Sequence, residues 1–130
     1  MRLLLDTQVW LWMVQDPARL SAESRDRLVD PSSTLLLSAA SSWEIAIRSA
    51  IGKLELPVPA RDFVPSRMQR DAVDGLPVTH AHALRVATLP PLHRDPFDRL
   101  LVAQAQLERI PIMTADRQIP RYDVEVLPAA

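Results

Sequence analysis

Four acidic residues, far apart in the chain, have the chemistry needed to bind a divalent cation. They are Asp6, Glu44, Asp98 and Asp116. Carboxylates that lie close together repel one another and resist ionising unless a cation neutralises them. Mg²⁺ prefers oxygen ligands and keeps water molecules that a phosphodiester oxygen can displace. Because such an ion activates a bound water and offsets charge on a leaving oxygen, the four acids predict hydrolysis of phosphodiester bonds.

Each acid also has a purely structural interpretation, which the sequence leaves open. Asp6 would cap the helix that follows its strand, Glu44 would be a solvated helix residue, and Asp116 would form a turn. Asp98, near a helix start at Asp95, would interact with the helix dipole. The metal interpretation depends on four acids from four separate segments that meet at one edge of a sheet.

Short apolar runs predict the strands that would position these acids. The clear runs span 2–5, 34–37 and 110–113, and weaker ones span 76–78 and 124–127. Segments with helical spacing lie between them. This alternation predicts an α/β fold, a three-layer sandwich with a mostly parallel sheet of four to five strands and helices on both faces. In such sheets ligands bind beyond the carboxyl ends of the strands, where Asp6 and Asp116 are expected.

Two segments carry clear helix signals. An apolar stripe at helical spacing consists of Trp43, Ala46, Ile47, Ala50 and Ile51. Gly52 is placed to end that helix. A second helix starts with Asp95 as N-cap and Pro96 at its first position, and runs to Glu108. Most of the 12 prolines fall within residues 57–96, so loops and short helices are expected there.

Length and composition predict a single domain over residues 1–130. Apolar residues make up 48% of the chain and charged residues 24%, an ordinary globular balance. The formal net charge of −1 gives no global positive field, so it neither predicts nor excludes nucleic acid. The absence of cysteine excludes disulfides and thiolate chemistry. Without a signal peptide or an apolar run of about 18 residues, we expect a cytoplasmic protein with no membrane contact.

Histidine and serine offer weaker candidates. His80 and His82 are two residues apart and do not share a helix face, and no cysteine accompanies them or His93. We therefore expect these histidines to be surface or capping residues and not zinc ligands. Ser41 and Ser42 lack the tight turn that presents a nucleophilic serine, which makes serine hydrolysis improbable.

Tryptophan and arginine are candidates for contacts around the acids. Trp10, Trp12 and Trp43 are expected in the core or at an interface, and a tryptophan at the rim of a site stacks on bases. Arg94 and Arg99 flank the proposed acids and are candidates for binding phosphate, with plain surface charge as the alternative.

Several segments resemble the PIN-domain family and, within it, the VapC-type toxins of bacterial toxin–antitoxin pairs. The segments are Leu4–Thr7, Ser42–Ile47, Gly52–Leu54, Leu89–Ala105 and Met113–Asp116. The string His93–Ala105 is the most specific of them. The resemblance implies a PIN-like fold with Asp6 and Asp98 as ligands of Mg²⁺ or Mn²⁺, and with Glu44 and Asp116 completing the site directly or through water.

The same resemblance implies roles for three further residues and for partners. Thr7 and Thr114, beside the first and last acids, would position water or a carboxylate, and Asp95 would be an additional acid of the subgroup. The implied function is a metal-dependent endoribonuclease toxin that forms a homodimer. A small antitoxin would lay its C-terminal segment across the site.

Three alternatives remain at this stage. The first is a housekeeping PIN nuclease without an antitoxin, and the second is a PIN-like module that binds RNA or a partner without cutting. The third, a receiver or dehalogenase-type phosphoryl enzyme, is disfavoured because Asp6-Thr7-Gln8 lacks the second aspartate of the dehalogenase motif. Transfer, ribosomal and messenger RNA all remain possible substrates.

Overall fold

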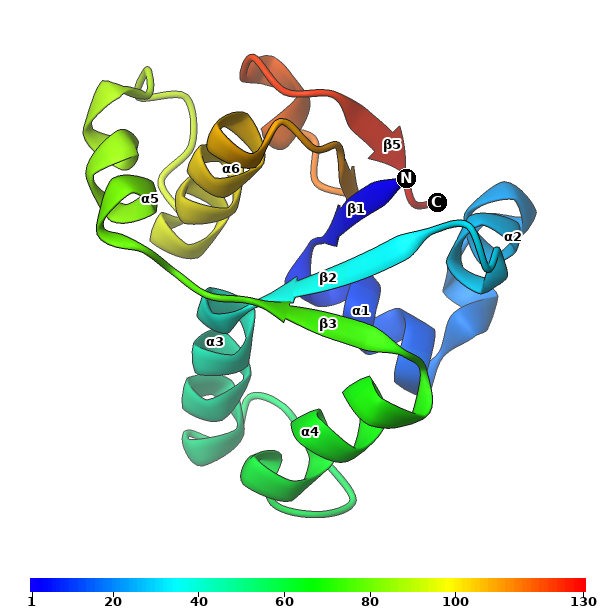
Figure 1. Cartoon of the computed structure of the whole chain (residues 1–130). Coiled ribbons are helices and arrows are strands. Elements are labelled where there is room, and N and C mark those ends of the chain that lie inside the picture. Colours follow the sequence, from blue (N-terminus) through cyan, green and yellow to red (C-terminus); the bar gives the residue numbers. More distant parts are fainter.

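Five short strands form one sheet in which every pair of neighbours is parallel. The computed structural model describes residues 1–130 and is shown in Figure 1. The strands are β1 (Arg2–Leu5), β2 (Thr34–Ser38), β3 (Val73–Leu76), β4 (Ile112–Thr114) and β5 (Val126–Pro128). Their order across the sheet is β3-β2-β1-β4-β5. The predicted parallel α/β sheet is therefore confirmed.

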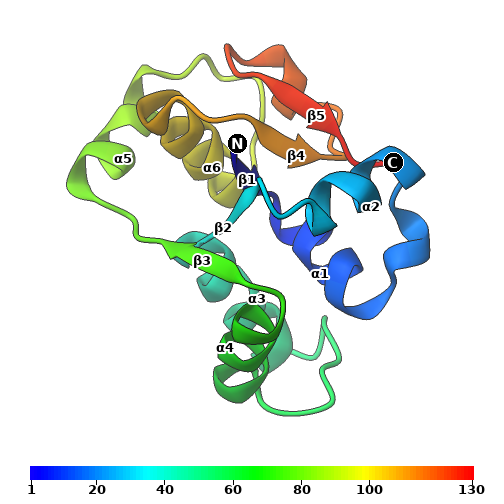
Figure 2. The same ribbon diagram turned by 45° about the vertical axis from the view of Figure 1, so that its right-hand side comes forward.

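Helices cover both faces of this sheet. They are α1 (Thr7–Gln15), α2 (Ala22–Val29), α3 (Ala39–Ala50), α4 (Ala60–Arg70), α5 (His80–Arg85) and α6 (Pro96–Glu108). Three short 3-10 helices are η1 (Pro17–Arg19), η2 (Val86–Thr88) and η3 (Ile119–Arg121). Figure 2 shows α5 and α6 on one side of the sheet and α1 and α2 on the other. The predicted three-layer sandwich is confirmed.

Alternation along the central strands divides the core between the two faces. Leu3 and Leu5 of β1 pack into one buried cluster with α1, α2 and α4, whereas Leu4 packs into the other with α6. All three leucines are fully buried. Successive side chains of a strand point to opposite faces, so an unbroken apolar run is what a strand covered on both sides requires.

Three predicted strands differ from the observed ones in where they begin. The segment 76–78 was expected as a strand, but β3 lies earlier, at Val73–Leu76, because Pro77 has no N–H to donate to the sheet. β3 is an edge strand, and its two middle residues are exposed. The strands expected at 110–113 and 124–127 begin two residues later, as β4 and β5.

Helix α3 exists as predicted, but its apolar stripe faces solvent. Trp43 is 62% exposed and Ile51 is 60% exposed, while the buried residues of this helix include Ser41 and Ile45. The helix ends as expected, with Gly52 in the left-handed region at φ 76°. Periodicity identified the helix, but its most apolar face is not the one turned to the core.

The start of α6 also follows the prediction. Asp95 caps the helix, since its Oδ1 accepts hydrogen bonds from the backbone N–H groups of Phe97 at 2.9 Å and Asp98 at 3.3 Å, and Pro96 is the first helical residue. The proline-rich middle contains more helix than expected. Helix α4 runs for 11 residues with Pro65 inside it.

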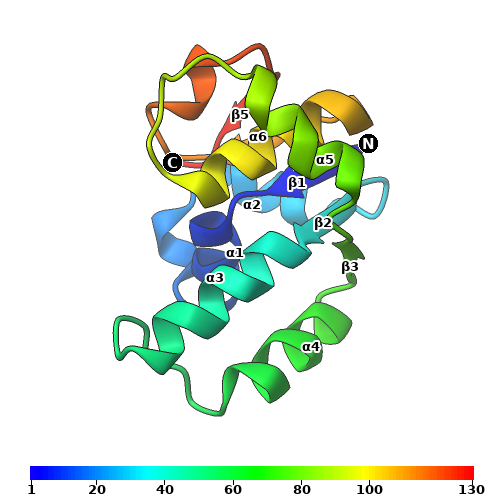
Figure 3. The same ribbon diagram turned by 90° about the vertical axis from the view of Figure 1, so that its left-hand side faces the viewer.

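The strand order creates one crevice at the carboxyl ends of the strands. From β1 the chain moves to β2 and β3 on one side, and later returns to β4 on the other side of β1. In open α/β sheets a ligand binds where the strand order reverses in this way. Figure 3 shows the starts of α1 and α6 together at this edge, above α3. No helix of the structure has the length and apolar character that crossing a membrane requires.

Candidate metal centre

The structure brings five carboxylates into one pocket at that edge. The pocket has a volume of about 310 Å³ and is lined by all four predicted acids and by Asp95. Its remaining lining residues are Thr7, Gln8, Trp12, Arg48 and Ala115. Four separate segments of the chain supply these acids, as the sequence predicted.

Asp6 is the most deeply placed of the acids. Its side chain is buried, with the residue 5% exposed. Oδ1 caps α1 by accepting a hydrogen bond from the Gln8 N–H at 2.7 Å. Oδ2 accepts a hydrogen bond from the Thr114 hydroxyl at 2.5 Å, at the edge of the pocket. Burial raises the pKa of Asp6, against the opposing effect of these hydrogen bonds. The capping interpretation and the metal interpretation are therefore compatible.

Thr114→Val is expected to raise the pKa of Asp6 further and to lower the free energy of unfolding by about 1–3 kcal/mol. The substitution removes the hydroxyl that donates to Asp6, and also the oxygen that accepts the Asp116 N–H at 3.0 Å. Carboxyl ¹³C NMR titration and chemical denaturation measure the two effects. Thr88→Val, at an exposed site, is the matched control. An unchanged Asp6 titration in Thr114→Val would contradict the prediction.

Asp116 also combines a structural and a pocket role. Its Oδ1 accepts hydrogen bonds from the backbone N–H groups of Gln118 at 2.6 Å and Ile119 at 3.4 Å, which starts η3. Its Oδ2 lies 3.4 Å from Nε2 of His93, inside the cluster. One carboxylate thus orders the loop after β4 and faces the pocket.

Asp98 has the most perturbed carboxyl of the cluster. Burial, together with the negative charges of Asp95, Asp6 and Asp116, raises its pKa to about 7. Asp95 itself is held by its capping bonds to the first turn of α6. The resemblance implied Asp98 as a metal ligand and Asp95 as an additional acid, and these roles stay predictions.

Glu44 approaches the pocket from α3. Burial raises its pKa, and the charges of Asp95 and Asp6 raise it further, while the positive charge of Arg48 opposes the rise. The guanidinium of Arg48 lies 3.8 Å from the Glu44 carboxylate. Thr7 lies directly after Asp6 and donates its hydroxyl hydrogen to Oγ of the buried Ser41 at 2.8 Å.

The two arginines expected to bind phosphate occupy different environments. Arg99 donates to the carbonyl oxygens of Val86, Leu89 and Pro90 and to the Tyr122 hydroxyl, at 2.9–3.4 Å. Its guanidinium therefore holds the loop before α6 and is not part of the pocket lining. Arg94 is exposed beside Asp95 and also lies outside that lining.

Sequence reasoning missed His93 and Arg48 as members of this site, and it named Trp12 only as one of three tryptophans suited to the core, an interface or the rim of a site. His93, expected to be a surface or capping residue, lies with Nε2 2.9 Å from Oδ2 of Asp98. Arg48 follows Glu44 by four residues, so their shared helix face was a signal available in the sequence. The sequence spacing did not place Trp12 or His93 at the site. A turn of α1 brings Trp12 to the acids, and the loop before α6 brings His93 there.

The donor set fits a hard divalent cation. Five carboxylates face one positive side chain, Arg48, around the pocket. Burial raises the pKa values of Asp6, Glu44 and Asp98, and the negative charges of neighbouring acids add to each rise. His93, Asp98 and Asp116 also have potential ligand atoms within 4.8 Å of one another. Oxygen donors with an unbalanced negative charge are what Mg²⁺ and Mn²⁺ prefer.

Comparison with known proteins agrees with this geometry. The sequence model of the PIN domain matches residues 3–125. Ribonuclease VapC16 of Mycobacterium tuberculosis is 48% identical over 60 residues, which make up 46% of this chain and 43% of that protein. The match thus spans less than half the length of this relative.

Solved structures share the fold over nearly the whole chain. The VapBC2 structure from Rickettsia felis, bound to a DNA fragment from the promoter, has a chain with a TM-score of 0.77 and 13% identity, covering 100% of both chains. A chain of a toxin–antitoxin complex from Klebsiella pneumoniae has a TM-score of 0.64 and 16% identity, covering 96% of this chain and 95% of its own. At this identity the likeness concerns the fold alone.

Proposed function

Because the chain belongs to the PIN-domain family, we propose that it is a metal-dependent endoribonuclease and the toxin of a toxin–antitoxin pair. The observation that carries the proposal is the convergence of five carboxylates on one pocket at the reversal of strand order. The 48% identity to a ribonuclease over 60 residues supports RNA as the substrate. Action in the cytoplasm stays a prediction.

Each acid has a distinct task in this proposal. Asp6 and Asp98 are the main ligands of Mg²⁺ or Mn²⁺, and Glu44 and Asp116 complete the site directly or through water. When bound, the ion lowers the pKa of a water molecule and offsets charge on the leaving oxygen. Glu44 is suited to accept a proton from the attacking water, because its raised pKa makes it a stronger base than an ordinary glutamate.

Contacts to the RNA are proposed at the rim of the pocket. Arg48 lines the pocket and takes over the phosphate-binding task first expected of Arg99. Trp12 lines the same pocket and offers a ring on which a base can stack. Arg94, exposed beside Asp95, remains a candidate for an outer phosphate.

The test is cleavage of defined RNAs by the purified protein with Mg²⁺, Mn²⁺ or EDTA. We expect cutting with either metal, none in EDTA, and recovery when metal is added in excess. Full cleavage in EDTA would overturn the metal mechanism. RNA binding without cutting in either metal would favour the non-catalytic PIN-like module. Mapping the 5′ ends produced in cells identifies the RNA.

The exposed stripe of α3 is the proposed homodimer surface. Trp43, Ile47 and Ile51 are 62%, 37% and 60% exposed and follow one another at four-residue spacing. Trp43 also packs edge-to-face on Phe97, with ring centroids 5.2 Å apart, which joins α3 to the start of α6. Since a two-fold interface uses the same patch on both subunits, this apolar stripe is suited to pack against its own copy.

Trp43→Glu is expected to convert the dimer into a monomer, because a charge buried in an apolar interface is left without a partner. Size-exclusion chromatography with light scattering measures the change. Val29→Glu, a matched substitution at a residue that is 79% exposed on α2, is expected to leave the dimer intact. A Trp43→Glu protein that remains dimeric would place the interface elsewhere.

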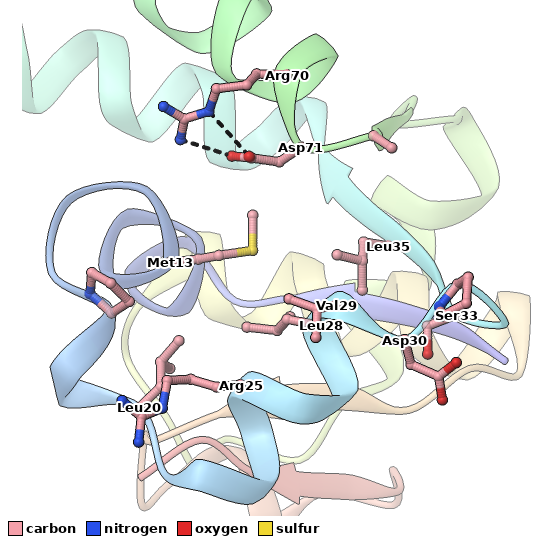
Figure 4. Close-up of a pocket in the computed structure, with 13 residues that line it drawn as sticks. Met13, Leu20, Arg25, Leu28, Val29, Asp30, Ser33, Leu35, Arg70 and Asp71 are labelled. Atoms are coloured by element: carbon pink, nitrogen blue, oxygen red, sulfur yellow. Dashed lines mark hydrogen bonds and ion pairs between the residues drawn. The ribbon is translucent and has the colours of Figure 1, made fainter.

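A second surface is proposed for the antitoxin. A groove of about 700 Å³ runs between α1, α2 and the end of α4 (Figure 4). Met13, Leu20, Leu28, Val29 and Leu35 supply apolar lining. Arg25 and Asp30 add charge, as do Arg70 and Asp71, which are ion-paired at 3.1 Å. An apolar floor with charged walls suits an amphipathic helix of a protein partner.

Val29→Glu is expected to weaken antitoxin binding at least about tenfold, because it places a charge in the apolar part of the groove. The partner to test is the protein encoded by a neighbouring short reading frame, co-expressed and measured by calorimetry. Trp43→Glu serves as the matched control and is expected to bind the antitoxin as the wild type does. Equal affinity of Val29→Glu and wild type would remove the groove from the proposal.

A further inference from the structure

His93 joins two acids that come from different parts of the chain. It lies in the loop between η2 and α6, and its side chain is 18% exposed. Its Nε2 atom is 2.9 Å from Oδ2 of Asp98 and 3.4 Å from Oδ2 of Asp116. A single ring nitrogen therefore contacts one acid of α6 and one acid that follows β4.

The contacts of the ring assign its proton to one of the two nitrogens. The backbone N–H of Asp95 donates to Nδ1 at 3.5 Å, so Nδ1 is the acceptor. In a neutral imidazole the other nitrogen is then the donor. Nε2–H consequently donates to Asp98 and has no lone pair free for a metal ion.

A chain of hydrogen bonds behind the pocket holds this ring in place. The backbone N–H of His93 donates to the Tyr122 hydroxyl at 2.9 Å, and Arg99 donates to the same oxygen at 3.1 Å. Tyr122 is only 4% exposed. The further bonds of Arg99 to three carbonyls of the loop make His93 part of a rigid support for the acids.

We infer that His93 is a positioning residue of the metal centre. Its Nε2–H orients the carboxylate of Asp98, beside that of Asp116, so that Asp98 can bind a divalent cation. His93 itself does not ligate the cation. This inference rests on the proposed metal-dependent function. Groups that hydrogen-bond to metal ligands and orient them typically contribute about 10- to 100-fold to metal affinity or activity. An Asp98 carboxylate without this donor would rotate away from its crowded acidic neighbours.

Calorimetry with Mn²⁺ tests the positioning role. His93→Ala is expected to bind Mn²⁺ about 10- to 100-fold more weakly than wild type. His93→Gln, whose amide N–H can replace the Nε2–H donor, is expected to recover most of that loss. His80→Ala removes an exposed histidine on α5 and is expected to bind as wild type does. Equal Mn²⁺ affinity of His93→Ala and wild type, with both folded by circular dichroism, overturns the inference.

Spectroscopy separates positioning from ligation. In ¹⁵N-labelled wild type, we expect the His93 ring to carry its proton on Nε2 in EDTA and to keep it when Mg²⁺ is added. With Mn²⁺, pulsed electron paramagnetic resonance is expected to give the same ¹⁴N signal in wild type and in His93→Gln, because the His93 ring does not bind the ion. A ¹⁴N coupling that is present in wild type and absent in His93→Gln, or loss of the Nε2 proton with Mg²⁺, would make His93 a ligand and overturn the inference. Wild type that binds no Mn²⁺ would instead remove the metal from the proposed function, and the inference with it.

Discussion

Asp98→Asn is expected to lower the rate of RNA cleavage about a thousandfold while making the metal-free protein more stable at neutral pH. The amide keeps the shape of the side chain but cannot supply the negative charge that holds a divalent cation. The same charge is unfavourable without metal, because burial and then the neighbouring acids raise the pKa of Asp98 to about 7. Single-turnover cleavage and thermal unfolding in EDTA measure the two effects.

Two aspartate variants control this experiment. Asp123→Asn removes an exposed carboxylate outside the pocket and is expected to change neither quantity. Asp95→Asn keeps the cap of α6, since asparagine caps helices as well as aspartate does, so it isolates the charge of Asp95. If Asp98→Asn cleaves RNA at the wild-type rate, Asp98 is not a catalytic or metal-binding residue. A lower melting temperature of Asp98→Asn than of wild type in EDTA would show that the charge of Asp98 does not destabilise the metal-free protein.

The strand pattern carried most of the information on the fold. Unbroken leucine runs such as Leu3-Leu4-Leu5 and Leu35-Leu36-Leu37 are typical of strands buried on both faces, which implies helices on both sides of a parallel sheet. Edge strands carry less of this signal. β3 contains Asp74 and Gly75, both exposed, so the apolar run 76–78, which shares only Leu76 with β3, was mistaken for the strand.

Helix periodicity showed where α3 lies but not which face is buried. Trp43 and Ile51 share a stripe that would normally face a core, yet both are exposed. The buried side includes Ser41, whose hydroxyl accepts a hydrogen bond from Thr7. A surface that binds another protein has the same apolar pattern as a core-facing one, so sequence alone could not distinguish them.

The acids of the site were predictable because parallel topology brings strand ends together. Asp6 and Asp116 follow neighbouring strands, so their proximity follows from the order of β1 and β4. His93 and Arg99 were not placed correctly, since their positions depend on the conformation of an irregular loop. The hydroxyl of Tyr122, 29 residues from His93, organises that loop by a tertiary contact that leaves no periodic signal.

The metal-free protein is expected to lose stability as the pH rises from about 4 to about 7. Asp98 has a pKa of about 7 in the folded chain and an ordinary value of 3.8, so over this range the folded state binds more protons than the unfolded state. Stability then falls with increasing pH. The raised pKa values of Asp6 and Glu44 act in the same direction.

A divalent metal should reverse this trend at high pH, where the acids are ionised and able to bind it. At a free concentration 100 times the dissociation constant, binding to the native state alone adds about 2.7 kcal/mol. Thermal unfolding at pH 5 and pH 8, in EDTA and in Mn²⁺, gives the four values needed. We expect the pH 8 sample in EDTA to melt lowest, and Asp98→Asn to flatten the dependence. A metal-free protein that melts higher at pH 8 than at pH 5 would contradict the raised pKa of Asp98, and with it the view that repulsion among these acids is relieved by a cation.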